Sequence, residues 1–301
     1  MTIRIFALAI LLALAGCAGE GVNLSQLSSL ASGAGSSSSS SGINAGTLVQ
    51  TAQKVQQAST EINEEQEIAL GRGIASNLLG AQHSGLHPDK QLQQYVNRVG
   101  RWLASQSERP DLPWHFVVLD NEGLNAFAAP GGYVFVTSGL LAQMSSEAEL
   151  AGVLGHEISH VLKKHHLQAI QKNAWASIGV DLGGQVLSSK TGVPPALAGA
   201  MTNVVKNLYA SGLDQADEYE ADRMGVVLAA RAGYDPYGLP AVLQMMESFD
   251  PDAPLVALMF ATHPPLAQRL EQLNRRMSPA LDRFSRQQTL APRYIRYLAR
   301  H

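Results

Sequence analysis

Apolar positions recur at helical spacing over most of the chain from about residue 61 onward. In the stretch from Ile62 to Gly80, acidic residues come first and apolar residues follow three or four positions apart, which indicates an amphipathic helix. The same spacing predicts further helices over Pro88–Ser105, Asp214–Ala232, Tyr237–Ser248 and Pro265–Arg276. We therefore expect this part of the chain to be mainly helical, and no internal repeat is visible in it.

Three short apolar segments between these helices indicate strands. Trp114–Asp120 is a short apolar run that turn residues follow, and Asn125–Ala129 and Tyr133–Thr137 flank a Pro-Gly-Gly turn. The proline at position 130 suits the end of an edge strand and would not suit the centre of a sheet. We expect Asn125–Ala129 to be an edge strand paired with Tyr133–Thr137, in an α+β, mainly helical domain with a small antiparallel sheet.

The N-terminus has a different pattern. Ile5–Ala15 is an apolar run of eleven residues after a single arginine, which suits a signal peptide and is too short to span a bilayer. The run ends in Leu-Ala-Gly-Cys17, which resembles a bacterial lipobox, so residues 1–16 are expected to be a lipoprotein signal peptide and Cys17 the lipidated residue. A plain secretory signal followed by a buried cysteine is the alternative. Ala18 resembles the sorting residue of outer-membrane lipoproteins that face the periplasm.

The rest of the chain divides by composition. Residues 17–60 contain six consecutive serines flanked by glycines and are expected to form a flexible tether, because such a segment cannot bury a core. Residues 61–276 are the expected folded domain, and 277–301 form a basic tail, interpreted as a solvated face, with a weak contact to anionic lipid or to a partner as the alternative. The apolar stretch Ala174–Ser211 is interpreted as a cover over a functional site or a pair of core helices, and an element that dips into a membrane is the alternative. The net charge of −3 argues against a broad basic surface, so no nucleic-acid partner is expected.

The strongest chemical signal is an HExxH motif, His156 to His160, in an apolar helix that Ser146 and Glu149 begin with a capping box. Histidines at i and i+4 differ by about 40° around a helix, so both imidazoles can reach one zinc ion. Glu157 lies beside the first histidine, where it can act as general base for a water molecule. Two histidines hydrogen-bonded within a core are the alternative.

A catalytic zinc usually takes three protein ligands. His166 has the spacing of the third histidine in HExxHxxGxxH proteases, but Lys163, a good helix former, stands where that pattern has glycine. If the helix continues through Lys163, His166 lies about 15 Å along the axis from His156 and about 100° off its face. We therefore expect His165 and His166 at the polar end of the helix, away from the metal.

The other candidate for a third ligand is a carboxylate in the stretch DEYEADRMG, residues 217–225. Glu218 and Asp222 share one helical face, whereas Glu220 points almost opposite. This spacing makes Glu218 the candidate ligand and Asp222 the candidate acceptor that orients a ligand histidine. An acidic, solvated helix face is the alternative.

Several motifs together resemble the zinc metallopeptidase family that includes HtpX and the CAAX prenyl protease. They occur in the family order and cover about residues 61–276: NAFAAPGGYVFVTSGLL, EAELAGVLGHEISHV, DEYEADRMGV and THPPLAQRL. With its lipobox, the chain is similar to the periplasmic lipoprotein, LoiP-like branch. The segment after Arg276 is too short for the helical-repeat domain of larger relatives, so that domain is not expected here.

The resemblance implies a zincin-like domain of the gluzincin type, with one Zn²⁺ per chain on His156, His160 and Glu218. It also implies that His263 and Arg269 lie near the active site and stabilise the tetrahedral intermediate or contact substrate. A helix-start loop and a surface arginine are the alternative, and in some periplasmic relatives this histidine itself binds zinc. By analogy with zincins, an extended substrate would pair with the edge strand at Asn125, Ala126, Phe127 and Ala128.

The expected protein is a membrane-anchored periplasmic zinc endopeptidase in quality control of outer-membrane or envelope proteins. In the expected reaction, Glu157 takes a proton from a zinc-activated water that attacks the peptide carbonyl. Expected partners are unfolded or misassembled envelope proteins, the membrane through the lipid, and the outer-membrane assembly machinery. The rivals are a chaperone or assembly factor that uses the same groove, and a lipoprotein with a structural zinc, which the presence of Glu157 and a three-ligand set disfavours.

Overall fold

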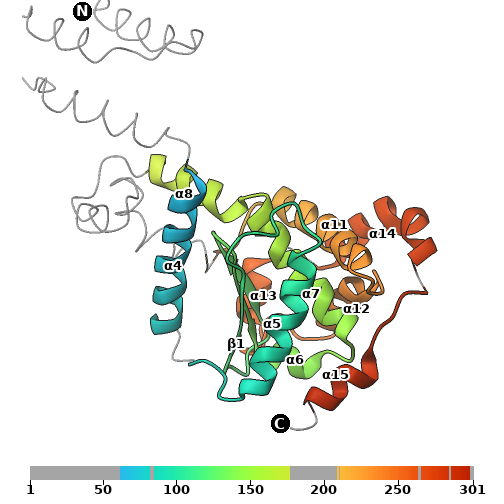
Figure 1. Ribbon diagram of the computed structural model, residues 1–301. Coiled ribbons are helices and arrows are strands. Elements are labelled where there is room, and N and C mark those ends of the chain that lie inside the picture. Colours follow the sequence, from blue (N-terminus) through green and yellow to red (C-terminus); the bar gives the residue numbers. More distant parts are fainter. Residues whose placement is uncertain are drawn as a thin grey trace, which may run out of the picture. The chain divides into compact units, whose positions relative to one another are not determined.

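The computed structural model describes residues 62–81, 85–176, 209, 211–263, 266–284 and 286–298. The expected signal peptide, Cys17, the serine-rich tether and most of the segment Ala174–Ser211 lie outside these residues. The elements in chain order are α4 (Glu64–Ala81), α5 (Lys90–Ala104), β1 (His115–Leu119), β2 (Ala126–Ala129), β3 (Tyr133–Thr137), α6 (Ser138–Gln143), α7 (Glu147–Leu162), α8 (His165–Ala176), α11 (Gln215–Arg231), α12 (Gly238–Met246), α13 (Ala257–Thr262), α14 (Leu266–Leu281) and α15 (Ala291–Leu298) (Figure 1).

The helices expected from the apolar spacing are confirmed as α4, α5, α7, α11, α12 and α14. Among the helices that were not predicted, α6 and α13 have six residues each, which is too short for a periodic signal. Helix α15 was also not predicted, since it lies in the segment interpreted as a basic, solvated tail. Among the described residues, none of the helices is both long and apolar enough to cross a membrane.

The three strands form a mixed sheet in the order β1-β3-β2. The predicted hairpin is confirmed, since β2 pairs antiparallel with β3 and lies at the edge. The expectation of an antiparallel sheet is wrong in one respect, because β1 pairs parallel with β3, with His115 opposite Tyr133. Strand β3, the second strand of the hairpin, lies between β1 and β2. It therefore runs antiparallel to β2 and in the same direction as β1.

Side chains alternate between the two faces of this sheet, as strand geometry requires. Phe116, Val118, Val134 and Val136 belong to the main core, which also contains the apolar faces of α5 and α7. On the opposite face, Phe135 packs with neighbouring strand residues and with α4. The sheet is therefore covered by helices on both faces, and β2 is held at its edge beside α7.

Helix α7 is the centre of the domain and packs against α5, α11 and α12 (Figure 1). It approaches α11 closely because glycines face each other at the crossing. A Cβ on Gly155 would lie 2.8 Å from the carbonyl oxygen of Gly225, and a Cβ on Gly225 would lie 2.6 Å from the backbone nitrogen of His156. This contact brings the acidic face of α11 against the histidines of α7.

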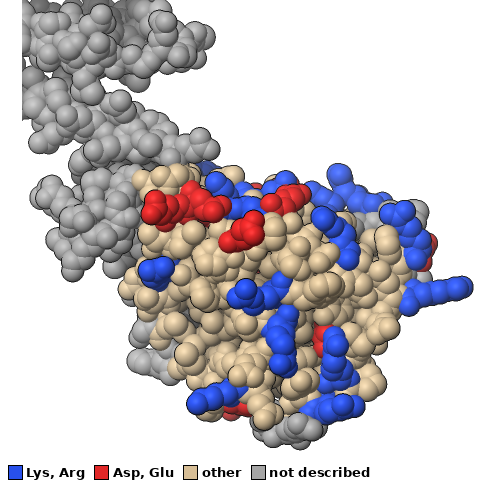
Figure 2. Space-filling view, in the orientation of Figure 1, with Lys and Arg blue, Asp and Glu red and all other residues tan. Residues whose placement is uncertain are grey.

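The C-terminal helix α15 packs onto the same core. Tyr294 is fully buried, and its hydroxyl donates a 2.7 Å hydrogen bond to the carbonyl oxygen of Leu141. Arg293 forms an ion pair with Glu147, the buried first residue of α7. The predicted boundary after Arg276 falls inside α14. On the face shown in Figure 2, Lys and Arg side chains are spread over much of the surface, whereas Asp and Glu gather near the upper edge.

Candidate metal centre

The histidine helix begins and ends at well-defined residues. Ser146 is its N-cap and accepts a 3.2 Å hydrogen bond from the backbone N–H of Glu149, which confirms this half of the predicted capping box. The Glu149 carboxylate accepts a 2.8 Å hydrogen bond from the backbone N–H of Ser145, the residue before the N-cap. The prediction that the helix continues through Lys163 is wrong: α7 ends at Leu162, and Lys164 adopts a left-handed conformation with φ +58°. The next helix, α8, starts at His165 and turns the chain back toward the site.

Three side chains converge at the centre of the site. The Nε2 atoms of His156 and His160 lie 3.0 Å apart. One carboxylate oxygen of Glu218 lies 3.6 Å from Nε2 of His156, and the other lies 3.4 Å from Nε2 of His160. All three side chains are buried, and the glutamate comes from α11, as its spacing with Asp222 predicted.

This donor set fits a zinc ion. Ligand atoms at 2.0–2.1 Å from one tetrahedral centre are about 3.3–3.4 Å apart, close to the separations of the two Nε2 atoms and the carboxylate oxygens. Oε1 of Glu218 is buried without a hydrogen-bond donor among the described residues, although two imidazole nitrogens face its carboxylate. A cation bound between these atoms would satisfy this buried carboxylate oxygen.

His156 is supported from behind by a carboxylate. Its Nδ1 lies 2.8 Å from Oδ1 of Asp222. Arg269 holds both oxygens of that carboxylate, through Nε at 2.8 Å and a terminal nitrogen at 2.5 Å. Arg269 is only 2% exposed, and its other terminal nitrogen lies 3.8 Å from Glu218. The guanidinium therefore lies behind the ligands.

His160 is supported by another histidine. Its Nδ1 lies 2.9 Å from Nδ1 of His165, and Nε2 of His165 lies 3.3 Å from a carboxylate oxygen of Glu220. His165 is 3% exposed, so the break after α7 buries it against the ligand. The expectation that His165 and His166 run past the site is wrong, since the ring of His166 is also only 5.4 Å from that of His160.

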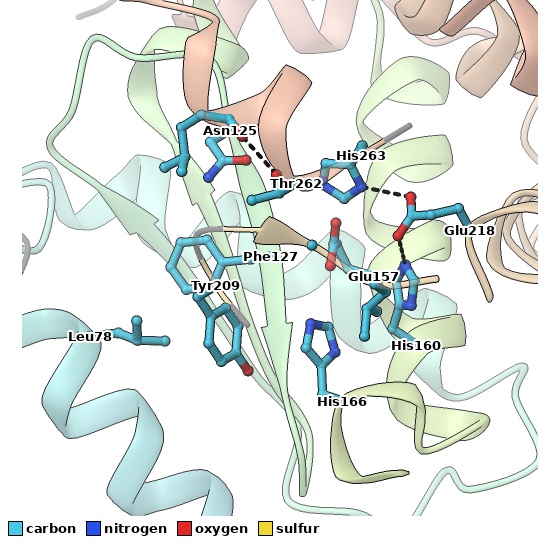
Figure 3. Close-up of a pocket in the computed structure, with 13 residues that line it drawn as sticks. Leu78, Asn125, Phe127, Glu157, His160, His166, Tyr209, Glu218, Thr262 and His263 are labelled. Atoms are coloured by element: carbon cyan, nitrogen blue, oxygen red, sulfur yellow. Dashed lines mark hydrogen bonds and ion pairs between the residues drawn. The ribbon is translucent and has the colours of Figure 1, made fainter. Parts of the chain in front are cut away.

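The remaining groups line a pocket beside the three ligands (Figure 3). Glu157 is buried next to His156, and its carboxylate points into this pocket. His263, at the end of α13, hydrogen-bonds through Nδ1 to Oε2 of Glu218 at 2.7 Å. Donor atoms of His156, Glu218 and His263 lie within 4.8 Å of one another, so His263 can also reach an ion at this site.

The edge strand forms the opposite wall of the pocket. Asn125 and Phe127 line it, together with His166 and Tyr209. The Tyr209 ring stacks on the His166 imidazole, with ring centroids 5.1 Å apart, and its hydroxyl donates a 2.7 Å hydrogen bond to the carbonyl oxygen of Ala128. The structure thus places the strand expected to pair with substrate within the same pocket as Glu157.

Burial and neighbouring charges shift the pKa values of these groups in different directions. Burial lowers the pKa of His160 well below its usual value, so this imidazole is neutral. Burial also lowers the pKa of His156, but its hydrogen bonds to Asp222 and Glu218 outweigh burial and raise the pKa to about 9. Glu218 is buried, yet the adjacent histidines hold its pKa well below the usual value. Burial raises the pKa of Glu157, which brings this carboxylate closer to the range of a general base.

Two pocket residues and one supporting residue were missed from the sequence. Tyr209 and His166 line the pocket, and His165 contacts a ligand histidine. The pair of adjacent histidines was visible, but the turn that directs both toward His160 depends on a left-handed lysine, which no local residue preference indicates. Tyr209 lies in the apolar stretch Ala174–Ser211, where no motif distinguishes it.

Comparison with known proteins identifies the class of protein. The sequence profile of peptidase family M48 matches residues 90–277, more than half of the chain, and the chain belongs to this family. The family expected from the four motifs is therefore confirmed. The matched range contains the three candidate ligands, Glu157, His263 and Arg269.

Individual relatives are proteases of bacteria and mitochondria. The beta-barrel assembly-enhancing protease of Yersinia pestis is 30% identical over 231 residues, which cover 73% of this chain and 45% of that protein. The protein of the same name from Escherichia coli (strain K12) is 32% identical over 63% of the chain and 39% of its own length. The mitochondrial metalloendopeptidase OMA1 of Arabidopsis thaliana is 30% identical over 67% of the chain and 39% of its own length. The chain spans less than half the length of these relatives.

Proposed function

We propose that this protein is a zinc-dependent endopeptidase of the gluzincin type with a zincin-like catalytic domain. The observation that carries the proposal is the convergence of His156, His160 and Glu218, with Glu157 beside them in a pocket and an edge strand opposite. One Zn²⁺ per chain would be held by the two Nε2 atoms and the Glu218 carboxylate. Membership of the M48 family supports the same activity.

Zinc held by these ligands supplies a Lewis acid that polarises a peptide carbonyl and lowers the pKa of water toward neutrality. Glu157 is the proton acceptor in the attack of water on the carbonyl carbon, and it passes that proton to the leaving amine. Its burial beside the ligands suits both roles, because burial raises the pKa of the carboxylate above its usual value and makes it a better proton acceptor.

His263 and Arg269 have different places and therefore different proposed roles. His263 lines the pocket, so it can donate a hydrogen bond to the oxygen of the reacting carbonyl or hold the resting site closed through Glu218. Arg269 is bound to Asp222 behind His156, and we assign it to positioning the carboxylate that orients this ligand. The two residues six positions apart thus act on opposite sides of the ligand set.

The proposed substrate is an extended segment of an unfolded or misassembled envelope protein. Such a segment can add to the β2 edge through main-chain hydrogen bonds and needs no particular side chain. The proposed pairing segment is the edge strand with the residue before it: Asn125, Ala126, Phe127 and Ala128. The Asn125 backbone is already bonded to Thr137, and the Ala128 carbonyl oxygen accepts from Tyr209, so a paired substrate would take the place of the Tyr209 hydroxyl. This kind of recognition suits quality control, in which substrates differ in sequence.

The cellular setting is also a proposal. Residues 1–16 would be a lipoprotein signal peptide, with lipidated Cys17 and the tether to residue 60 holding the 61–276 domain at the periplasmic face of the bacterial outer membrane. Relatives named beta-barrel assembly-enhancing proteases support an envelope role and suggest the outer-membrane assembly machinery as a partner. The second candidate function is a chaperone or assembly factor that holds unfolded chains in the same groove, because an open sheet edge binds chains without cutting them.

The variant Glu157→Gln tests the assignment. It should bind zinc with unchanged stoichiometry and lose at least about a hundredfold in the rate of cleavage of a disordered protein such as casein, because the proton acceptor is removed. Glu271→Gln is the matched control, since Glu271 is exposed on α14 and pairs with Arg275. Full cleavage by Glu157→Gln, or a wild-type protein that takes up no zinc, contradicts the proposal. Complementation of a deletion strain by Glu157→Gln would favour the chaperone function.

A further inference from the structure

The contact between His160 and His165 is unusual because two ring nitrogens of the same kind face each other. Their Nδ1 atoms are 2.9 Å apart, so one must donate a proton and the other must accept it. The rings meet edge to face, with an interplanar angle of 72°, and both residues are buried. The far nitrogen of His165 faces two carboxylates, Glu220 at 3.3 Å and, beyond hydrogen-bond distance, Asp217 at 3.8 Å.

A bound cation fixes the direction of both hydrogen bonds. Nε2 of His160 faces the other ligands and has no proton when it binds a metal, so the proton of this neutral ring is on Nδ1. His160 must then donate to Nδ1 of His165, which leaves the proton of His165 on Nε2. That proton points at Glu220, whose carboxylate accepts it. One arrangement of protons satisfies the whole chain of contacts.

We propose that His165 is a positioning residue for the zinc ligand His160, acting as a neutral acceptor whose tautomer is set by Glu220. The proposal rests on the proposed zinc site. Ligand histidines are normally held by a hydrogen bond from their second nitrogen, and loss of such a partner typically costs about 10–100-fold in metal affinity. Here the acceptor is an imidazole from the next helix.

The turn between the helices is built to present this ring. Lys163 is the C-cap of α7, Lys164 is left-handed, and α8 begins with His165 itself. Without the left-handed residue, the chain would continue as a helix and carry His165 away from His160. His166, the next residue, approaches the same ligand only through ring contact, since its stacking partner is Tyr209. The competing explanation is a polar contact that only joins α7 to α8.

The experiment compares two substitutions of His165 in the purified full-length protein. Zinc dissociation constants are measured by competition with a chromophoric chelator, and thermal unfolding of the zinc-free proteins reports folding. His165→Ala should bind zinc about 10–100-fold more weakly than wild type. His165→Asn should recover to within a few-fold, because its side-chain carbonyl oxygen stands where Nδ1 stood and accepts the same hydrogen bond. Lys172→Ala is the control, since Lys172 lies on the same helix as His165 and its side chain makes an exposed 3.2 Å contact to Asp214.

The outcomes separate the possible failures. If wild type binds zinc tightly and His165→Ala binds equally tightly, the proposal is overturned while the zinc site stands. If both variants lose affinity together, with equal losses of zinc-free stability, His165 only joins the helices and the proposal is again overturned. Absence of zinc binding by wild type would contradict the proposed function itself. In nitrogen-15 spectra of the zinc-loaded protein, His165 should be protonated on Nε2; protonation on Nδ1 overturns the proposal independently of affinity.

Discussion

The two histidines of the HExxH motif differ in what supports them. Nδ1 of His156 faces the Asp222 carboxylate at 2.8 Å, whereas Nδ1 of His160 faces the Nδ1 atom of His165 at 2.9 Å. The first support is a carboxylate, and the second is an imidazole ring. Two ligands four residues apart on one helix therefore use two different solutions to the same requirement, a hydrogen-bond acceptor behind the metal-binding ring.

The difference follows from what surrounds each acceptor. Asp222 is 1% exposed, so its charge needs a partner, and the buried guanidinium of Arg269 supplies it. Burial by itself raises the pKa of Asp222, but this arginine and the hydrogen bond from His156 outweigh burial and lower the pKa to about 2. The outer nitrogen of His165 faces Glu220, whose side chain lies near the surface. One support is a fully buried ion pair, and the other leads from a buried ring to a partly exposed carboxylate.

The supports also differ in how far along the chain they lie from the histidine that each one holds. Asp222 and Arg269 come from α11 and α14, so the His156 support requires the packing of three helices. The His160 support comes from the residue that opens the next helix. We infer that the first support depends mainly on global folding, whereas the second depends on one turn.

The largest effect is expected from breaking the charged support, which is the Asp222 carboxylate that holds His156 together with Arg269. Asp222→Ala leaves Arg269 buried without its carboxylate, and the free energy of unfolding of the zinc-free protein should fall by about 3–5 kcal/mol. His165→Ala removes a neutral hydrogen bond and should lower it by only about 1–3 kcal/mol. Urea denaturation of the zinc-free proteins measures both. The double variant Asp222→Leu/Arg269→Met should recover part of the stability, and equal losses in the two single variants would show that the distinction between the supports is wrong.

The turn itself gives an intermediate effect. Lys164 has φ +58°, a conformation that glycine adopts freely and that β-branched residues strongly disfavour. Lys164→Val should therefore cost about 1–2 kcal/mol of unfolding free energy and weaken zinc binding, because His165 is displaced. Lys164→Gly should keep wild-type zinc affinity. Both variants lose the 3.8 Å contact between Lys164 and Glu67. The difference in zinc affinity between them therefore reports the effect of the backbone conformation at position 164. Equal zinc affinities in the two variants would mean that the turn does not place His165.

The charged support could be predicted from the sequence because each part of it lies on a regular helix. The i, i+4 spacing put His156 and His160 on one face of α7, and the same rule put Glu218 and Asp222 on one face of α11. Only the crossing of the two helices had to be supplied by the fold, and facing glycines at positions 155 and 225 permit it. The resemblance to a known family added Arg269, although not its place behind Asp222.

The support of His160 by His165 could not be predicted, because the position of His165 depends on a break in a helix. Lys163 and Lys164 both favour helix by intrinsic propensity, so local reasoning extended α7 past His166. Burial of His165 against His160 is a tertiary contact that outweighs this preference. The parallel pairing of β1 with β3 was missed for a similar reason, since apolar alternation indicates strands but does not give their order in the sheet.

The smallest effect is expected at Glu220, the carboxylate that contacts His165 from the surface side. The Glu220 side chain is 38% exposed and contacts both Lys163 and His165. The hydrogen bond from Lys163, and to a smaller extent that from His165, lowers the pKa of Glu220. Glu220→Gln keeps an oxygen that can accept from His165 and loses only a solvent-screened charge, which is worth about 0.2–1 kcal/mol. Zinc affinity should therefore fall by less than about fivefold, as measured by chelator competition. Glu220→Ala, which also removes the acceptor, should weaken binding further. A loss in Glu220→Gln as large as that in His165→Ala would show that the charge of Glu220, rather than the position of its oxygen, supports His160.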